Sequence, residues 1–222
     1  MGYKEIYNEW LTNAYFDADT KAELERIASD ENEIKERFYT DLEFGTAGLR
    51  GIIGAGTNRM NIYTVRKATQ GLANYILKSG NAEKGVAIAF DSRRMSPEFA
   101  QEAACCLAAN GIKAYVFDSL RPTPELSYAV RKLGCIAGIN ITASHNPPEY
   151  NGYKVYWEDG AQITPPHDKG IMDEVKAVTD YTTMKTMPAE DAKAAGLYEV
   201  IGAEVMMLHS RAEKAGDPSG CH

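Results

Sequence analysis

The sequence predicts an α/β fold with a mostly parallel, mixed sheet sandwiched between helices. Short apolar segments at Val86–Phe90, Ala114–Phe117 and 136–141 alternate with helical segments, and strand–helix alternation of this period implies crossover units and a parallel sheet. The length of 222 residues, with 44% hydrophobic and 25% charged residues, is sufficient to bury a core without disulfides.

The helices between these strands are predicted from their start and stop signals. Residues 96–98 (SPE) and 123–125 (TPE) each provide a hydroxyl cap, a proline for the first turn and an acid that suits the helix dipole. Gly111 and Gly134 follow the expected helix ends. The same signals and apolar periodicity predict helices over about 61–79 and about 164–178, a strand-like run over 48–54, a strand over 153–157, and a further strand within 197–205.

The first forty residues are predicted to form short amphipathic helices. Thr20 and Glu23 fit a capping box, and Asp30 with Glu33 repeats this start signal. We therefore expect three parts: an N-terminal helical segment over 1–40 that packs on the domain, one α/β domain over 41–205, and a divergent tail or stub of a second domain over 206–222.

Composition excludes several classes of protein. The chain has 24 Lys and Arg against 31 Asp and Glu, so no basic surface for nucleic acid is expected. No apolar run approaches the ~18 residues of a membrane span, and the charged N-terminus is no signal peptide. The four cysteines, which lack the spacing of a metal site, are interpreted as reduced thiols: Cys105, Cys106, Cys135 and Cys221. We therefore expect a cytoplasmic protein without a membrane partner.

A polar loop over residues 142–148 (TASHNPP) follows the strand that ends at 141. Ligands of open α/β sheets bind beyond the carboxyl ends of strands, so this segment is a candidate functional loop, although an ordinary polar turn remains an alternative. The chain has no Gly-x-Ser-x-Gly elbow, no P-loop and no dinucleotide fingerprint. The glycine-rich run over 45–56 is also compatible with a simple flexible turn.

Four segments together resemble the α-D-phosphohexomutase family, which includes phosphoglucomutases and phosphomannomutases. Residues 142–147 (TASHNP) resemble its phosphoserine loop. Three further segments match the family in their order along the chain and in their residue types, namely 45–51 (GTAGLRG), 91–93 (DSR) and 151–154 (NGYK). The resemblance extends from about residue 10 to about 205 and implies the first domain of such an enzyme. These enzymes interconvert hexose 1-phosphate and hexose 6-phosphate through a bisphosphorylated intermediate.

The resemblance implies a role for individual residues. Ser144 matches the phosphorylated serine, Lys154 the acid/base lysine, His145 the assisting histidine and Arg50 the arginine that faces the transferred phosphoryl group. A phosphoserine has about −1.5 to −2 charge, so its transfer depends on alignment and charge stabilisation. Contacts with substrate or phosphate are expected from Thr46, Asn146 and Arg93, although Asp91 and Arg93 equally suit a structural ion pair.

The resemblance also implies parts that this sequence lacks. Magnesium would be held by the phosphate on Ser144 and an Asp-x-Asp-x-Asp cluster, which is absent, and glucose 1,6-bisphosphate is the expected activator. The C-terminal domains that read the sugar are the expected partners. We therefore expect a fragment with little activity of its own. A non-catalytic phosphosugar-sensing or partner-binding module is the alternative, and a serine hydrolase or phosphatase is a third hypothesis.

Overall fold

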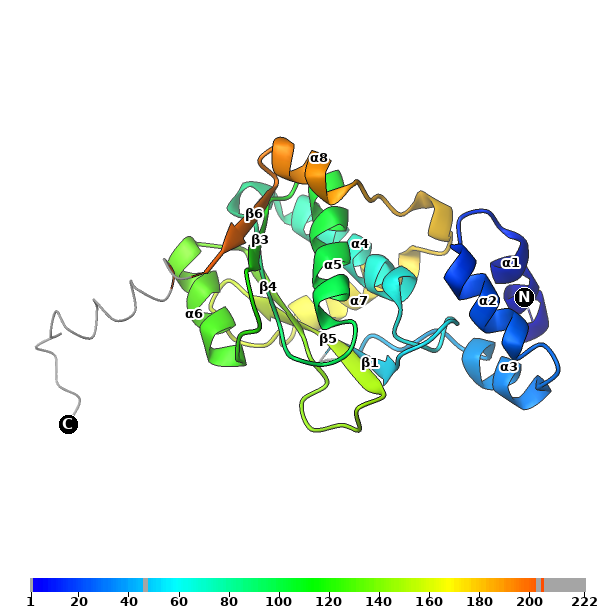
Figure 1. The fold of residues 1–222 in the computed structure, drawn as a ribbon. Coiled ribbons are helices and arrows are strands. Elements are labelled where there is room, and N and C mark those ends of the chain that lie inside the picture. Colours follow the sequence, from blue (N-terminus) through cyan, green and yellow to red (C-terminus); the bar gives the residue numbers. More distant parts are fainter. Residues whose placement is uncertain (1, 46–47, 203–204, 206–222) are drawn as a thin grey trace, which may run out of the picture.

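The computed structural model describes residues 2–45, 48–202 and 205, which fold around a six-stranded mixed sheet (Figure 1). The strand order is β1-β5-β4-β2-β3-β6. Strands β4, β2, β3 and β6 are parallel, whereas β5 is antiparallel to both β4 and β1. The strands are β1 (Leu49–Ile52), β2 (Val86–Phe90), β3 (Ala114–Phe117), β4 (Ala137–Ile141), β5 (Tyr150–Trp157) and β6 (Tyr198–Ile201). The predicted α/β class is confirmed.

Helices cover both faces of the sheet. Val86 and Ile88 of β2 pack into the larger core with α4, α5 and α7, whereas Ala87 and Ala89 pack against α6. This division follows from the alternation of side chains along a strand. The helices are α4 (Ile62–Ser79), α5 (Ser96–Ala109), α6 (Thr123–Leu133), α7 (His167–Ala177) and α8 (Ala189–Ala194), with short 3-10 turns at Ala82–Lys84 and Tyr181–Thr183.

The N-terminal helices α1 (Tyr3–Thr12), α2 (Ala18–Arg26) and α3 (Glu31–Phe38) form a cluster beside the sheet domain (Figure 1). Trp10, which is 1% exposed, stacks on Phe16 at 4.2 Å and meets the ring of Tyr63 edge-on at 5.4 Å. Because Tyr63 belongs to α4, these aromatic contacts attach the helical segment to the main domain.

Several predicted helix starts need correction. The Asp17 carboxylate, rather than Thr20, caps α2 by accepting from the Thr20 amide, whereas Asp30 caps α3 as expected. Helices α5 and α6 begin at Ser96 and Thr123, so the hydroxyl residues lie inside the helices and their side chains do not cap them. The Ser96 hydroxyl instead donates to the Asp91 carboxylate, and the Thr123 hydroxyl accepts from the buried Asn140 amide.

The remaining boundaries differ by a few residues. Strand β5 begins three residues before the predicted strand, α7 begins three residues late, and β6 occupies only part of the predicted 197–205 segment. The predicted tail over 206–222, like Cys221, lies outside the described residues. Cys105, Cys106 and Cys135 are buried free thiols.

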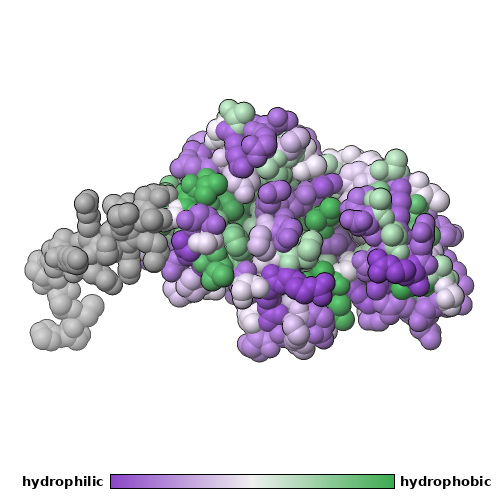
Figure 2. Space-filling model, viewed as in Figure 1, coloured by the Kyte–Doolittle hydropathy of each residue, from purple (hydrophilic) through white to green (hydrophobic). Residues whose placement is uncertain are grey.

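The surface of the described part is mainly polar in the view of Figure 2, with apolar side chains gathered over the region of α6 and β6. The exposed apolar residues there include Leu120 and Val200, at 56% and 54% exposure. Within the described ranges, no helix combines the length and the apolar character that crossing a membrane requires.

Candidate functional site

The serine loop, residues 142–149, joins β4 to β5 at the edge where β2 and β4 end. Ser144 has a positive φ of 55° and an exposed side chain, whereas Thr142 is buried. The Ser144 amide donates to the Thr142 hydroxyl at 3.0 Å, and the Asn146 amide donates to the Ala143 carbonyl at 3.1 Å. These bonds form a tight turn that presents the serine hydroxyl to solvent.

Lys154 is the direct partner of this hydroxyl. Its ammonium donates to Ser144 Oγ at 2.7 Å. The antiparallel return of β5 explains the contact, because Tyr153 pairs with Ile141 and Lys154 with Asn140. Two residues ten positions apart in the sequence therefore meet at one end of a hairpin.

The pKa of Lys154 depends on its burial and on two neighbouring charged residues. Partial burial lowers the pKa of its ammonium below the ordinary value, and the positive charge of Arg50 lowers this pKa further. The Asp91 carboxylate acts in the opposite direction and raises the same pKa. Lys154 is therefore a better proton donor than an exposed lysine.

Arg50 lies on β1 opposite Gly152 of β5, with its side chain exposed. Gly152 lies between two other strands, and an added Cβ would stand 2.6 Å from the Thr142 carbonyl oxygen and 2.9 Å from that of Leu49. Only glycine fits this position without displacing the backbone. The close approach of β1, β5 and β4 brings Arg50 near Lys154.

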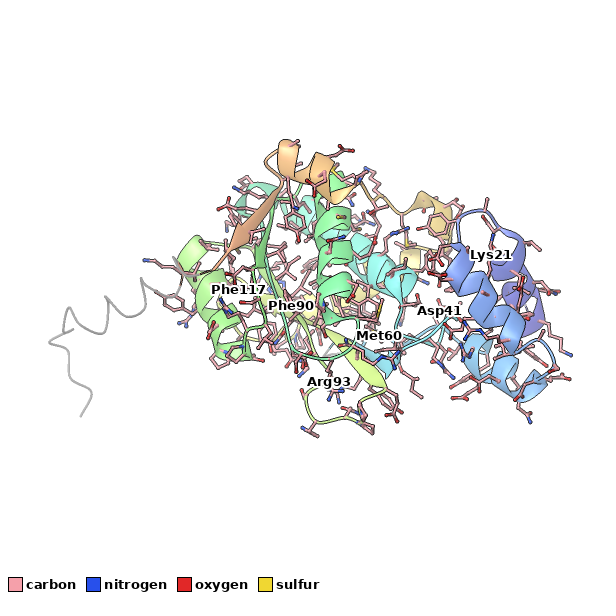
Figure 3. All side chains as sticks on the ribbon, in the orientation of Figure 1. Lys21, Asp41, Met60, Phe90, Arg93 and Phe117 are labelled. Atoms are coloured by element: carbon pink, nitrogen blue, oxygen red, sulfur yellow. The ribbon has the colours of Figure 1, made fainter. Side chains whose placement is uncertain are left out.

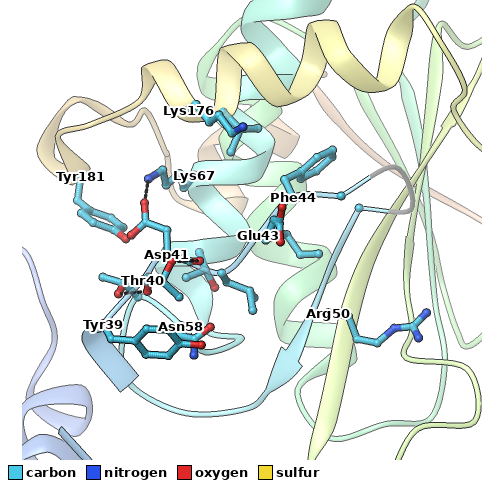
Figure 4. A pocket seen from close by; sticks show the side chains of 17 residues that line it. Tyr39, Thr40, Asp41, Glu43, Phe44, Arg50, Asn58, Lys67, Lys176 and Tyr181 are labelled. Carbon is cyan, nitrogen blue, oxygen red and sulfur yellow. Dashed lines mark hydrogen bonds and ion pairs between the residues drawn. The ribbon is translucent and has the colours of Figure 1, made fainter. Parts of the chain in front are cut away.

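A cavity of about 720 Å³ lies on the other side of β1. In Figure 4, the Arg50 side chain points away from its centre, where Lys67 pairs with Asp41 at 2.6 Å and lies near Tyr181. Neither Ser144 nor Lys154 lines this cavity. The cavity is therefore separate from the serine loop, which is open to solvent.

Arg93 holds the serine loop at the base of the β4–β5 connection (Figure 3). Its Nη2 donates to the carbonyls of Ser144 and Asn146 at 2.8 and 2.7 Å, and its Nη1 donates to those of Pro147 and Tyr150 at 2.9 and 3.0 Å. Both of these nitrogens are thus used within the protein. The geometry favours the structural interpretation of Arg93, and its phosphate contact stays a prediction.

The other predicted site residues that the structure describes form fewer side-chain hydrogen bonds than Lys154 and Arg93. His145 is exposed and forms no hydrogen bond or ion pair with the described part of the chain. Asn146 is half-buried and bonds through its backbone. Thr46 lies outside the described residues. The roles predicted for these three residues stay predictions. The hydrolase hypothesis gains no histidine bonded to Ser144 from the described residues, and Lys154 is the side chain that bonds to the Ser144 hydroxyl.

Sequence reasoning missed the buried polar residues behind the loop. Asn151 and Ser96 are both 0% exposed and bond to each other at 2.9 Å, and Ser96 Oγ donates to Asp91 at 2.9 Å. In the sequence, Asn151 belongs to the motif over 151–154 and Ser96 fits a helix cap, and neither pattern predicts this contact. An asparagine within a strand flanked by apolar residues is the one local signal, since this residue is depleted in strands.

Magnesium does not fit the described residues on their own. Over 2–45, 48–202 and 205, no group of three His, Cys, Asp or Glu side chains is placed to hold a metal ion. Asp17, the first acid of the only Asp-x-Asp pair near a helix start, bonds to the Thr20 amide and to Tyr63. A phosphate on Ser144 would supply a single ligand.

Comparison with known proteins agrees with this geometry. The model of the phosphoglucomutase/phosphomannomutase α/β/α domain I matches residues 41–182. A phosphoglucomutase of Staphylococcus epidermidis is 53% identical over 160 residues, covering 72% of this chain and 27% of that protein. Human phosphopentomutase is 44% identical over 163 residues, covering 69% and 27%.

A solved structure from Thermus thermophilus, provisionally named a phosphomannomutase, superposes with a TM-score of 0.60 at 28% identity. The match covers 73% of this chain and 33% of that one. The chain thus spans between a quarter and a third of the length of these relatives. On the family match and the sheet that presents Ser144 beside Lys154, the chain belongs to the phosphoglucomutase/phosphomannomutase family and includes its α/β/α domain I.

Proposed function

We propose that this chain is the serine-bearing domain of a phosphohexomutase that interconverts hexose 1-phosphate and hexose 6-phosphate. Ser144 would receive a phosphoryl group and return it through a bisphosphorylated sugar. The observation that supports this proposal is the 2.7 Å bond from Lys154 Nζ to the exposed Ser144 Oγ. The relatives of this segment include a phosphoglucomutase at 53% identity and a phosphopentomutase at 44% identity, so the choice of sugar would rest with the C-terminal domains.

Lys154 and Arg50 would stabilise the charge that moves during transfer. A sugar hydroxyl oxygen forms a bond to phosphorus while the bond from phosphorus to Ser144 Oγ breaks, and the electron pair remains on Oγ. Lys154 protonates Oγ, and the proton of the sugar hydroxyl passes to water. Because its pKa is lowered, Lys154 gives up its proton more readily than an ordinary lysine. Arg50 would face the transferred group.

Further parts of the proposal concern the rest of the enzyme. Magnesium would need ligands beyond the described residues, and glucose 1,6-bisphosphate would prime Ser144. His145, Asn146, Thr46 and Arg93 would assist binding of the phosphate. A cytoplasmic location suits the free thiols of the described cysteines. Since the chain spans under a third of its curated relatives, we propose that it has little mutase activity alone.

The test is a hybrid enzyme in which this chain replaces the matching segment of the Staphylococcus epidermidis relative. We expect glucose 1,6-bisphosphate with magnesium to phosphorylate Ser144, as measured by mass spectrometry of the tryptic peptide. Ser144→Ala should abolish both the label and mutase turnover, whereas Ser29→Ala, at an exposed serine of the N-terminal segment, should leave both unchanged. Equal turnover in the Ser144→Ala hybrid would refute the proposal.

A further inference from the structure

We propose that Asp91, Ser96 and Asn151 are positioning residues that hold the serine loop through Arg93. The inference rests on the proposed function, because the loop geometry matters for phosphoryl transfer to and from Ser144. None of the three touches the Ser144 hydroxyl. Their effect on it is transmitted by hydrogen bonds between the end of β2, the start of α5 and the start of β5.

The first step concerns the carbonyl groups of the serine loop, which need a positively charged donor between them. Four carbonyls, from residues 144, 146, 147 and 150, converge on the Arg93 guanidinium at 2.7 to 3.0 Å. Without a donor there, these dipoles would repel one another and the turn would open. A planar guanidinium presents its N–H groups in a fixed fork, whereas the ammonium of a lysine has only three donors. Arginine therefore fixes the loop in a way that lysine cannot.

The second step is the orientation of Arg93. The Asp91 carboxylate accepts from the Arg93 amide at 2.9 Å and lies 3.6 Å from its Nε. Since the two Nη atoms point to the loop, Nε is the nitrogen left to face Asp91. One carboxylate thus fixes both the backbone and the guanidinium of the same residue.

The third step fixes Asp91 itself. The Gly152 amide donates to Asn151 Oδ1 at 2.8 Å, so the Nδ2 group of Asn151 must donate to the Arg94 carbonyl and to Ser96 Oγ, both at 2.9 Å. The Ser96 hydroxyl, having accepted that bond, donates its proton to Asp91 at 2.9 Å. Ser96 and Asn151 are completely buried, which protects this chain of bonds from competing water.

Asp91 affects both the geometry of the serine loop, through Arg93, and the protonation of Lys154. Asn151 lies on β5 only three residues before Lys154, and the carboxylate of Asp91 favours the protonated form of Lys154. Asp91→Asn should therefore loosen Arg93 and lower the pKa of Lys154. Ser96→Ala keeps the carboxylate, so it should loosen the loop with a much smaller effect on that pKa.

The experiment compares Asp91→Asn, Ser96→Ala and Arg93→Lys with Asp118→Asn in this chain. Asp118 also follows a parallel strand and pairs with an arginine, Arg121, at 2.8 Å, but it does not bond to the serine loop. Hydrogen exchange is measured at the bonded amides of Ser144, Asn146 and Tyr150, and lysine Cε/Nζ NMR follows the titration of Lys154. Circular dichroism melting identifies any variant that fails to fold.

We expect exchange to accelerate by about tenfold or more in the three network variants and to stay unchanged in Asp118→Asn. Only Asp91→Asn should shift the Lys154 titration clearly to lower pH. Unchanged exchange in folded Arg93→Lys and Ser96→Ala proteins would overturn the proposal, as would equal acceleration in Asp118→Asn. If Asp91→Asn does not fold, these two variants still decide the result.

The hybrid enzyme separates this inference from the proposed function. In a hybrid that phosphorylates Ser144, Ser96→Ala should lower kcat more than it changes KM, and Asp91→Asn should also move the alkaline limb of the pH profile to lower pH. A change in KM alone would contradict the positioning role. If Ser144 is never phosphorylated while exchange still responds to the variants, the proposed function fails and the loop-positioning network stands.

Discussion

Replacing Gly48 by alanine should disrupt the junction between β1 and β5, whereas the same change at Gly45 should be harmless. Gly48 has a φ of 97°, which L side chains rarely adopt, and an added Cβ would overlap the carbonyl oxygen of Tyr153. It would also stand 3.1 Å from the Lys154 Cα. Gly45 has no atom within 4 Å of an added Cβ and no positive φ.

The size of the effect follows from two contributions. Forcing a non-glycine residue into this region costs about 1–3 kcal/mol. Relieving the overlap requires β1 to move away from β5, which weakens backbone hydrogen bonds worth about 1 kcal/mol each. Together these terms give about 3 kcal/mol for Gly48→Ala, or a drop in Tm of roughly 6–12 °C for a chain of this size. Gly45→Ala should stay within about 0.5 kcal/mol of the wild type.

Urea unfolding followed by circular dichroism measures the free energy of unfolding, and calorimetry gives Tm. The lysine titration adds a local readout, because movement of β1 takes Arg50 away from Lys154 and should raise the Lys154 pKa in Gly48→Ala. Equal stability of the Gly48→Ala and Gly45→Ala proteins would refute the close approach of β1 to β5.

Three further predictions concern charge and thiols. Arg50→Gln should raise the pKa of Lys154, since a nearby positive charge disfavours the ammonium form; lysine NMR would show no shift if the two residues were apart. Arg66→Met should cost about 3–5 kcal/mol in urea unfolding, because it leaves Glu102, bonded to Arg66 at 2.6 Å and only 15% exposed, without its cation; an Arg66→Met/Glu102→Leu variant should recover part of this loss. In a Cys221→Ser background, the native protein should show no rapid thiol reaction with DTNB at pH 8, because burial raises the pKa of Cys105 to about 11 and that of Cys135 to about 12; one fast equivalent would contradict this.

Sequence patterns predicted most of the fold because the central strands and helices are locally consistent. Val86–Phe90 and Ala114–Phe117 match β2 and β3 without change. The start of β5 was missed because Tyr150-Asn151-Gly152 contains two poor strand formers. Their extended conformation depends on tertiary contacts, namely pairing with β1 and the bond from Asn151 to Ser96.

The family resemblance identified Ser144, Lys154 and Arg50, which the structure brings close together. Local patterns alone did not reveal the residues that hold the serine loop. Ser96 was interpreted as a helix cap because a serine before a proline is typical of one. Its actual partners are Asp91 and Asn151, and Asn151 is 55 residues away in the sequence. No local pattern reports such a contact.

The antiparallel return of β5 explains why the proposed nucleophile and its proton donor can be held so closely. A parallel crossover would place a helix and at least a dozen residues between Ser144 and the next strand, with Lys154 positioned by long-range packing alone. The hairpin closes a loop of eight residues at small entropic cost, and Arg93 ties that loop to the adjacent parallel strand β2. The site therefore combines a short local connection, which sets the Ser144–Lys154 distance, with one long-range cation, which sets the shape of the turn. Loss of the Arg93 guanidinium should therefore change the shape of the serine loop before it separates Ser144 from Lys154.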